Sequence, residues 1–200
     1  MKKVFYISLV IPLVLNAQSE EMIDAFSESY SLEAVGNFAK AIEELNQVYD
    51  ESSYELNLRL GWLYYNMGNY FESKNKYQVA LGLMPYAIEA KLGYVLPVSA
   101  MGNWDEVVKT YEHILEIDPQ NSLVNYRMGA IYYERKQYEK ALIFCEKTVN
   151  QYPFDYDSVI LLAWIQFQMG NLREAEVLFK KSMLIKPNNS SAEYGLGLIK

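Results

Sequence analysis

The sequence predicts an all-α fold in which pairs of helices repeat along the chain. Proline recurs at a constant interval of 34 residues, at Pro85, Pro119, Pro153 and Pro187. Between these prolines, apolar residues recur at steps of three and four, the period of an α-helix, on both sides of a turn. A repeat of this length with two helices predicts a solenoid, in which each pair buries its apolar face against the next pair.

The turn within each repeat recurs at the same interval. The turn position is followed two residues later by an apolar side chain and three residues after that by a smaller side chain. The turn residues are Gly68, Gly102, Lys136 and Gly170; the apolar residues are Tyr70, Trp104, Tyr138 and Leu172; the smaller residues are Ser73, Val107, Ala141 and Ala175. These coincidences predict four full repeats, at residues 54–87, 88–121, 122–155 and 156–189.

Weaker repeats flank these four. Residues 22–53 have a turn at Gly36 but a polar first helix and no closing proline, as expected of a capping repeat. Residues 190–200 start another repeat with the pair Leu196-Gly197. We expect them to form a closing helix whose apolar side chains are covered by a partner or by a second copy of the chain. The prediction for residues 18–200 is therefore about five helix pairs and a terminal helix. Ser122 and Ser190 are the predicted N-caps of two of these helices.

The first 17 residues differ from the rest. Lys2 and Lys3 precede a run of apolar residues that ends at Leu15, and Ala17 provides a small residue for cleavage. This pattern predicts a secretory signal peptide at residues 1–17. The apolar run is shorter than the ~20 residues of a membrane-spanning helix. An uncleaved anchor or a buried first helix is the alternative. We expect an exported protein, periplasmic or secreted, of a bacterium, with no membrane segment after cleavage.

Composition and residue types exclude several functions. The chain has 18 basic and 25 acidic residues, so a basic surface for nucleic acid is not expected. Cys145 is its single cysteine and His113 its single histidine, too few for a disulfide, a zinc site or a catalytic triad. Cys145 falls at a helix-packing position and is expected to be buried. We predict no enzyme, cofactor or metal; a hydrolase that uses paired carboxylates stays open as a minor alternative.

The pattern within one repeat resembles the tetratricopeptide repeat. In residues 54–87, the pair Leu60-Gly61 is followed by Tyr64, the turn, the packing residues Ser73, Tyr77 and Ala80, and the closing Pro85. Met128-Gly129 and Leu162-Ala163 repeat the pair, whereas residues 88–121 depart from it with Tyr94-Val95 and with Pro97 in the first helix. The resemblance covers most of residues 18–200. It implies a right-handed α-solenoid.

In the resembled family, a concave groove lined by the first helix of each repeat binds partners. The corresponding positions here are rich in aromatic and acidic residues: Glu55, Trp62, Tyr65, Glu89, Tyr126, Tyr133, Glu134, Asp157, Trp164, Phe167 and Tyr194. Large aromatic side chains are suited to recognition because they bury much area at a low entropic cost. The Lys and Asn that clamp a peptide carboxylate in chaperone-docking members of the family are absent, with Leu58 and Trp62 in their places.

Three functions follow as hypotheses. The first is a protein-interaction scaffold in the cell envelope that binds a peptide or helix of a protein partner in this aromatic groove. The second is a carbohydrate-binding module, because aromatic faces beside carboxylates also stack on sugars. The third is a structural protein that self-assembles through the partial repeat at residues 190–200.

Overall fold

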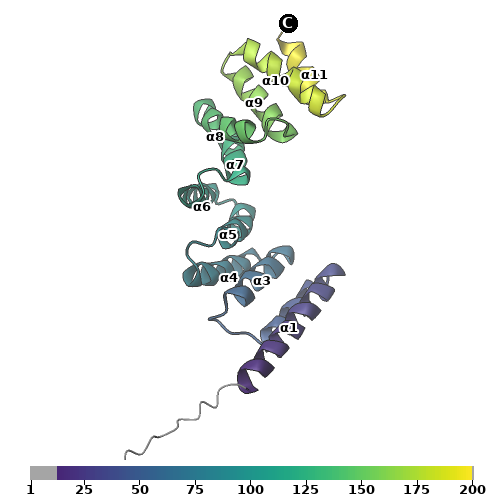
Figure 1. Ribbon diagram of the computed structural model, residues 1–200, viewed down its shortest axis with the longest axis vertical. Helices are drawn as coiled ribbons and strands as arrows, with labels where there is room; N and C mark the ends of the chain where they lie inside the picture. Colours follow the sequence, from purple (N-terminus) through teal and green to yellow (C-terminus); the bar gives the residue numbers. More distant parts are fainter. Residues whose placement is uncertain (1–12, 200) are drawn as a thin grey trace, which may run out of the picture. The chain divides into compact units, whose positions relative to one another are not determined.

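The computed structural model describes residues 13–199 and contains eleven helices and no strand in that range, which confirms the all-α prediction (Figure 1). The helices follow one another through short turns. Their bounds are α1 (Leu13–Ala34), α2 (Phe38–Gln47), α3 (Tyr54–Asn66), α4 (Tyr70–Leu83), α5 (Ile88–Ala100), α6 (Trp104–Ile117), α7 (Ser122–Glu134), α8 (Tyr138–Gln151), α9 (Tyr156–Gln168), α10 (Leu172–Ile185) and α11 (Ser190–Leu198).

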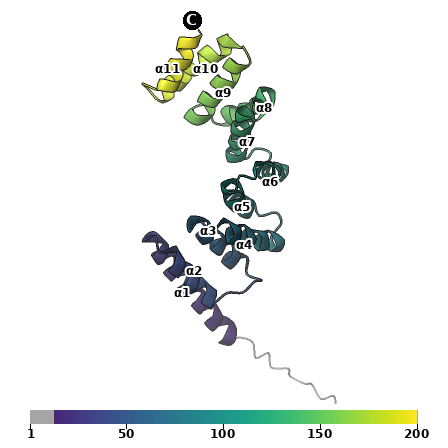
Figure 2. The same ribbon diagram turned by 180° about the vertical axis from the view of Figure 1, so that it is seen from behind.

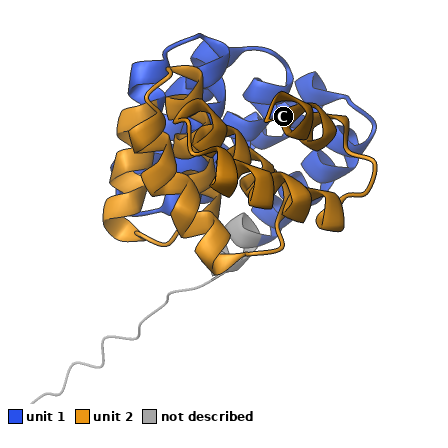
Figure 3. Cartoon of the chain, turned by 90° about the horizontal axis from the view of Figure 1, so that it is seen from above, with its two compact units in different colours: residues 1–107 blue, residues 108–200 orange. Residues whose placement is uncertain are grey.

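The chain divides into two compact units, and the division falls within α6. Unit 1 comprises residues 1–107 and unit 2 residues 108–200 (Figure 3). Inside each unit, consecutive helices pack on each other, from α1 to α5 in unit 1 and from α7 to α11 in unit 2, as α3 does on α4 and α9 does on α10 (Figures 1 and 2). The first helices of neighbouring repeats also touch: α3 contacts α5 in unit 1, and α7 and α11 both contact α9 in unit 2. This stacking of equivalent helices from successive repeats is the arrangement of a solenoid.

The turns inside the repeats have a common conformation. Gly36, Gly68, Gly102 and Gly170 have φ between 75° and 82°, and Lys136 has φ 57° at the same position. This left-handed conformation lets the chain reverse within a few residues after a helix, and glycine adopts it without a steric penalty. The predicted turn positions are therefore confirmed, including the one that lacks glycine.

The predicted N-caps Ser122 and Ser190 are wrong by one residue. Asn121 caps α7 through an amide oxygen that accepts a hydrogen bond from Val124 N at 3.1 Å, and Asn189 caps α11 in the same way from Ala192 N at 3.0 Å. The amide oxygen of Asn reaches the free N–H groups of the first turn as well as a serine hydroxyl does. Each serine is therefore the first helical residue.

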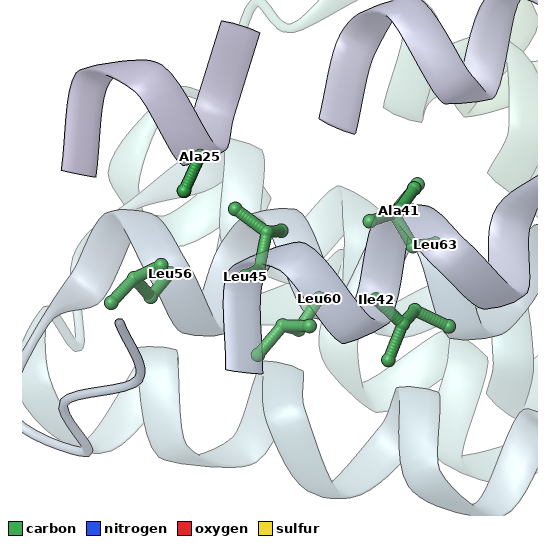
Figure 4. Packing of buried hydrophobic residues seen from close by; sticks show 7 residues of the cluster. All are labelled: Ala25, Ala41, Ile42, Leu45, Leu56, Leu60 and Leu63. Atoms are coloured by element: carbon green, nitrogen blue, oxygen red, sulfur yellow. The ribbon is translucent and has the colours of Figure 1, made fainter. Parts of the chain in front are cut away.

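One hydrophobic core cluster of unit 1 lies between α1, α2 and α3. Seven buried side chains from these helices form it: Ala25, Ala41, Ile42, Leu45, Leu56, Leu60 and Leu63 (Figure 4). In unit 2, a second cluster joins α9, α10 and α11 through Ala163, Ala175, Phe179 and Ala192. Each cluster draws on more than one repeat, so a repeat completes its core only with a neighbour.

Small residues on the first helices make room for large side chains of the second helices. The ring of Tyr77 lies between Gly61 and Gly93; a Cβ added at Gly93 would lie 2.6 Å from Tyr77 Cζ. In unit 2, a Cβ at Gly195 would lie 2.6 Å from Phe179 Cε1. Cys145 packs against Gly129 and is fully buried, as predicted, and burial raises the pKa of its thiol to about 12.

The predicted signal peptide falls mainly on residues 1–12, which lie outside the described residues. Helix α1 begins at Leu13, before the predicted cleavage position Ala17. Among the helices of residues 13–199, none combines the length and the apolar character that a membrane span needs.

Candidate functional site

Five of the aromatic residues predicted from the sequence belong to two clusters, one within each unit: Trp62 and Tyr65 in unit 1, and Trp164, Phe167 and Tyr194 in unit 2. In unit 1, Trp62 and Tyr65 lie one turn apart on α3 with their ring centroids 6.2 Å apart. Tyr65 also contacts Tyr70, the first residue of α4, at 5.8 Å. Trp62 is 37% exposed and Tyr65 is half-buried, so both rings are partly accessible to a partner while neighbouring rings hold them in place.

Trp62 is fixed by a carboxylate of the preceding repeat. Its indole N–H donates to Glu33 Oε1 at 2.5 Å, and the other oxygen of Glu33 is 2.5 Å from Arg59 Nη1. The Arg59 side chain is only 6% exposed, and its Nε donates to Ser29 Oγ at 3.1 Å. Its guanidinium carbon lies 3.8 Å from the centroid of the Tyr30 ring. We call Tyr30, Glu33, Arg59, Trp62 and Tyr65 the unit 1 cluster.

Sequence reasoning missed Tyr30 and Glu33, because the polar first helix of residues 22–53 was interpreted only as a cap. The spacing of the repeats nevertheless contains a signal that identifies these two residues. Gly36 precedes Gly68 by the same number of residues as Tyr30 precedes Trp62 and Glu33 precedes Tyr65. Alignment on the turn glycine therefore places Tyr30 and Glu33 in the same two positions as Trp62 and Tyr65.

In unit 2, Trp164 is the centre of the corresponding cluster. Its ring contacts Phe167 at 5.7 Å with an interplanar angle of 81°, and Phe179 at 4.9 Å with an angle of 75°. Tyr194, on α11, lies 6.1 Å away and is 65% exposed. The indole N–H donates to Ser191 Oγ at 2.9 Å. We call Trp164, Phe167, Tyr194 and Ser191 the unit 2 cluster.

Tyr126 and Tyr133, on α7 of the same unit, are half-buried. Tyr133 contacts the ring of Tyr138 at 5.7 Å, the same pairing that Tyr65 makes with Tyr70 in unit 1. Burial raises the pKa of both Tyr126 and Tyr133, and the Asp157 carboxylate raises that of Tyr126 further. Both hydroxyls are therefore neutral at physiological pH and can donate hydrogen bonds.

The predicted acidic residues lie at the surface. Glu55 accepts a hydrogen bond from Ser53 Oγ at 3.2 Å, and Glu89 accepts one from the Tyr54 hydroxyl at 2.7 Å. Glu134 is exposed at the end of α7. Across the described part of the chain, no three His, Cys, Asp or Glu side chains form a group that could hold a metal ion.

Family models described as tetratricopeptide repeat match residues 55–82, 99–159 and 156–189. Two curated proteins are similar in sequence. The human protein O-mannosyl-transferase TMTC1 is 30% identical over 146 residues, which are 69% of this chain and 16% of that protein. The TPR repeat-containing protein YpiA of Bacillus subtilis is 26% identical over 167 residues, 82% of this chain and 40% of YpiA. The chain thus spans less than half of either relative.

Solved structures share the fold. A tetratricopeptide repeat protein from Parabacteroides merdae superposes with a TM-score of 0.77 at 18% identity, covering 90% of this chain and 72% of that one. YrrB, described as a TPR protein with an unusual peptide-binding site, gives a TM-score of 0.71 at 15% identity and covers 90% and 94% of the two chains. Repeats of this kind therefore account for the stacked helix pairs of both units.

Proposed function

Because this chain is a tetratricopeptide-repeat protein, we propose that it is a non-enzymatic scaffold that binds a peptide or helix of a protein partner. The observation that supports this function most is the partly exposed aromatic cluster at the same repeat positions in each unit. Trp62 and Trp164 mark these positions, and both have their indole N–H groups bound within the fold. The description of YrrB as a protein with a peptide-binding site adds support by similarity.

The clusters are suited to binding because they are already ordered. Trp62 is held by Glu33 and Tyr65, and Trp164 by Ser191 and three rings. Fixing a flexible side chain on binding costs about 0.5–1.5 kcal/mol. Rings that are fixed before the partner arrives avoid most of that cost, so the area they bury contributes more fully to affinity.

The proposal places the scaffold outside the cytoplasm, in the cell envelope of a bacterium. It rests on the basic start at Lys2 and Lys3, the short apolar run and the small residue Ala17. Mass spectrometry of the protein recovered from its native host tests it. A mature chain that begins at Gln18 is expected, and a chain that retains Met1 or its neighbours would contradict export by cleavage.

The binding face is tested with paired substitutions on the two sides of the helix pairs. Trp62→Ala with Tyr133→Ala removes one first-helix ring from each unit. Phe71→Ala with Ile143→Ala is the matched control, because these residues are 66% and 58% exposed on second helices. Cross-linking followed by affinity purification should lose the partner with the first pair and keep it with the second, while circular dichroism stays unchanged. Equal recovery from both variants would contradict the proposed face.

A glycan is less well suited to these clusters than a protein segment. The ring of Trp164 is inclined by 81° to Phe167 and by 38° to Tyr194, so the three rings do not form one flat platform for sugars. Titration of tryptophan fluorescence with cell-wall polysaccharide fragments provides the check. A saturable shift would favour the carbohydrate hypothesis over the scaffold. Self-association through α11 stays a prediction.

A further inference from the structure

Charge is distributed unequally between the first and second helices of the repeats. The first helices, α1, α3, α5, α7, α9 and α11, contain ten acidic residues and three basic ones, Arg59, Lys91 and Arg127. The second helices, α2, α4, α6, α8 and α10, contain eleven acidic and nine basic residues, so their charges nearly balance. The uncompensated negative charge of the chain thus lies mainly on the helices that also hold the aromatic clusters.

Unit 1 holds most of this excess. Its first helices α1, α3 and α5 contain seven acidic residues, against Arg59 and Lys91. Arg59 is buried and paired with Glu33, so it neutralises one carboxylate and offers no positive charge to the surface. Six carboxylates remain, none of which forms an ion pair within the described residues: Glu20, Glu21, Asp24, Glu28, Glu55 and Glu89. An approaching cation therefore meets a negative surface.

The ring of Tyr30 already makes a cation–π contact within the fold. The Arg59 guanidinium lies over the Tyr30 ring, 3.8 Å from its centroid, while Tyr30 itself is 56% exposed. Ile23, two helical turns earlier on α1, is 65% exposed, and Glu20 precedes it by one turn. By helical spacing, the exposed Ile23 and Tyr30 thus share one side of α1 with Glu20, and Glu33 joins this helix to Trp62 on α3.

We propose that the first-helix face of unit 1 binds a basic amphipathic segment of a protein partner. Its apolar side chains would cover Ile23 and Trp62. Its lysine or arginine side chains would lie over the free part of the Tyr30 ring and beside the carboxylates of α1, α3 and α5. Cation–π contacts and charge pairs of this kind reinforce one another where apolar side chains exclude water. This inference rests on the proposed function and specifies the class of partner.

A second copy of the chain fits this face less well. The second helices hold half of the chain's 18 basic residues, but these nine stand beside eleven acidic ones and so present no net positive surface. The whole chain has a formal charge of −7, so two copies repel each other at long range. Charge complementarity therefore favours a different, basic protein.

Three synthetic amphipathic peptides of equal length test the inference. They combine leucine with lysine, with glutamine or with glutamate, and their binding to the full chain is measured by fluorescence anisotropy. The lysine peptide is expected to bind at least about tenfold more tightly than the glutamate peptide, and its affinity should fall as salt screens the charges. No binding of the lysine peptide, or equal binding of all three peptides, would overturn the inference.

Matched variants locate the binding face. Tyr30→Ser should weaken the lysine peptide roughly threefold to tenfold, the range of a cation–π contact. Tyr152→Ser, at a similarly exposed tyrosine of unit 2 outside the unit 2 cluster, should leave its affinity unchanged. Glu20→Gln, Asp24→Asn and Glu55→Gln together should weaken binding. Glu43→Gln, Glu139→Gln and Glu146→Gln, which remove the same charge from second helices, should not.

The outcomes separate this inference from the proposed function. If the two triple variants weaken the lysine peptide equally, the attraction comes from overall charge, and the inference is wrong. If Tyr30→Ser weakens all three peptides alike, the face binds partners without a preference for charge; the scaffold function then stands and the inference falls. Failure of the scaffold itself appears instead in the cross-linking experiment, as partner recovery that does not depend on Trp62 and Tyr133.

Discussion

Trp62 in unit 1 and Trp164 in unit 2 occupy the same position of their repeats but have different surroundings. The indole N–H of Trp62 binds the carboxylate of Glu33, which is paired with the buried Arg59. The indole N–H of Trp164 binds a neutral hydroxyl, and its ring packs among Phe167, Phe179 and Tyr194. One tryptophan thus belongs to a charged cluster and the other to an aromatic one.

The difference comes from the neighbouring repeats rather than from the tryptophans. Glu33 belongs to the repeat before Trp62, whereas Ser191 and Tyr194 belong to the repeat after Trp164. The repeat period determines which side of the helix pair a residue faces. The adjacent repeat determines what that residue contacts, and therefore which chemistry the surface can offer.

The largest expected effect concerns the ion pair of unit 1. Arg59→Met should lower the free energy of unfolding by about 3 kcal/mol, because it leaves the partly buried Glu33 carboxylate without a counter-charge. Adding Glu33→Gln should restore most of this loss, since the amide oxygen can still accept from Trp62. Urea unfolding measures both variants. If the double variant is as unstable as Arg59→Met alone, the unpaired charge of Glu33 is not the cause of the lost stability, and the prediction is wrong.

The unit 2 cluster provides the control for this prediction. Ser191→Ala removes the acceptor of the Trp164 N–H, a neutral hydrogen bond that contributes about 1 kcal/mol. Its cost should be clearly smaller than that of Arg59→Met. Equal costs would mean that the two tryptophans are held in energetically similar ways.

The next effect tests a feature that the units share. Gly93→Ala and Gly195→Ala each place a Cβ against a buried ring, that of Tyr77 or of Phe179, and should destabilise the chain by about 1–3 kcal/mol. Gly82→Ala is the control, because a Cβ there meets no atom within 4 Å. In α4 it should stabilise the helix by up to about 1 kcal/mol. If all three changes have the same sign, the close approach is not what requires glycine at these sites.

The smallest effect concerns two buried asparagines at equivalent positions. Asn57 Oδ1 accepts from the Tyr49 hydroxyl at 2.9 Å in unit 1, whereas Asn125 Oδ1 in unit 2 is buried without a hydrogen-bond partner. Ile117 precedes Asn125 by the same number of residues as Tyr49 precedes Asn57, so Ile117 occupies the position equivalent to Tyr49. Tyr49→Phe should cost about 1 kcal/mol, and Ile117→Tyr should add a similar stabilisation by supplying the missing donor. Thermal unfolding detects both changes, and a loss of stability in Ile117→Tyr would refute this equivalence.

Much of the fold could be predicted from the sequence because the repeat leaves a periodic signature. The turn residues, the burial of Cys145 and the small residue Gly61 beside Tyr77 all follow from period and spacing. The caps Asn121 and Asn189 were missed because Asn and Ser can both cap a helix, and only the backbone geometry decides which residue does.

The site was less predictable than the fold. The aromatic positions followed from the register, but their partners did not. The contacts of Arg59 with Glu33 and of Trp164 with Ser191 each join two different repeats. The pattern within a single repeat cannot predict them, because whether two such side chains meet depends on how the helices of the two repeats stack. The division of the chain within α6 also has no signal in the repeat period.

The burial of Cys145 makes its thiol a reporter of local unfolding in unit 2. Its thiol is fully buried in unit 2, and burial raises its pKa to about 12, so neither access nor ionisation permits reaction at neutral pH in the closed state. A thiol reagent can label it only when the helices around it open, and the labelling rate therefore counts these openings. Since the chain contains no second cysteine, the signal comes from unit 2 alone. Comparison of that rate with global unfolding would time the opening of one unit against the unfolding of the whole chain.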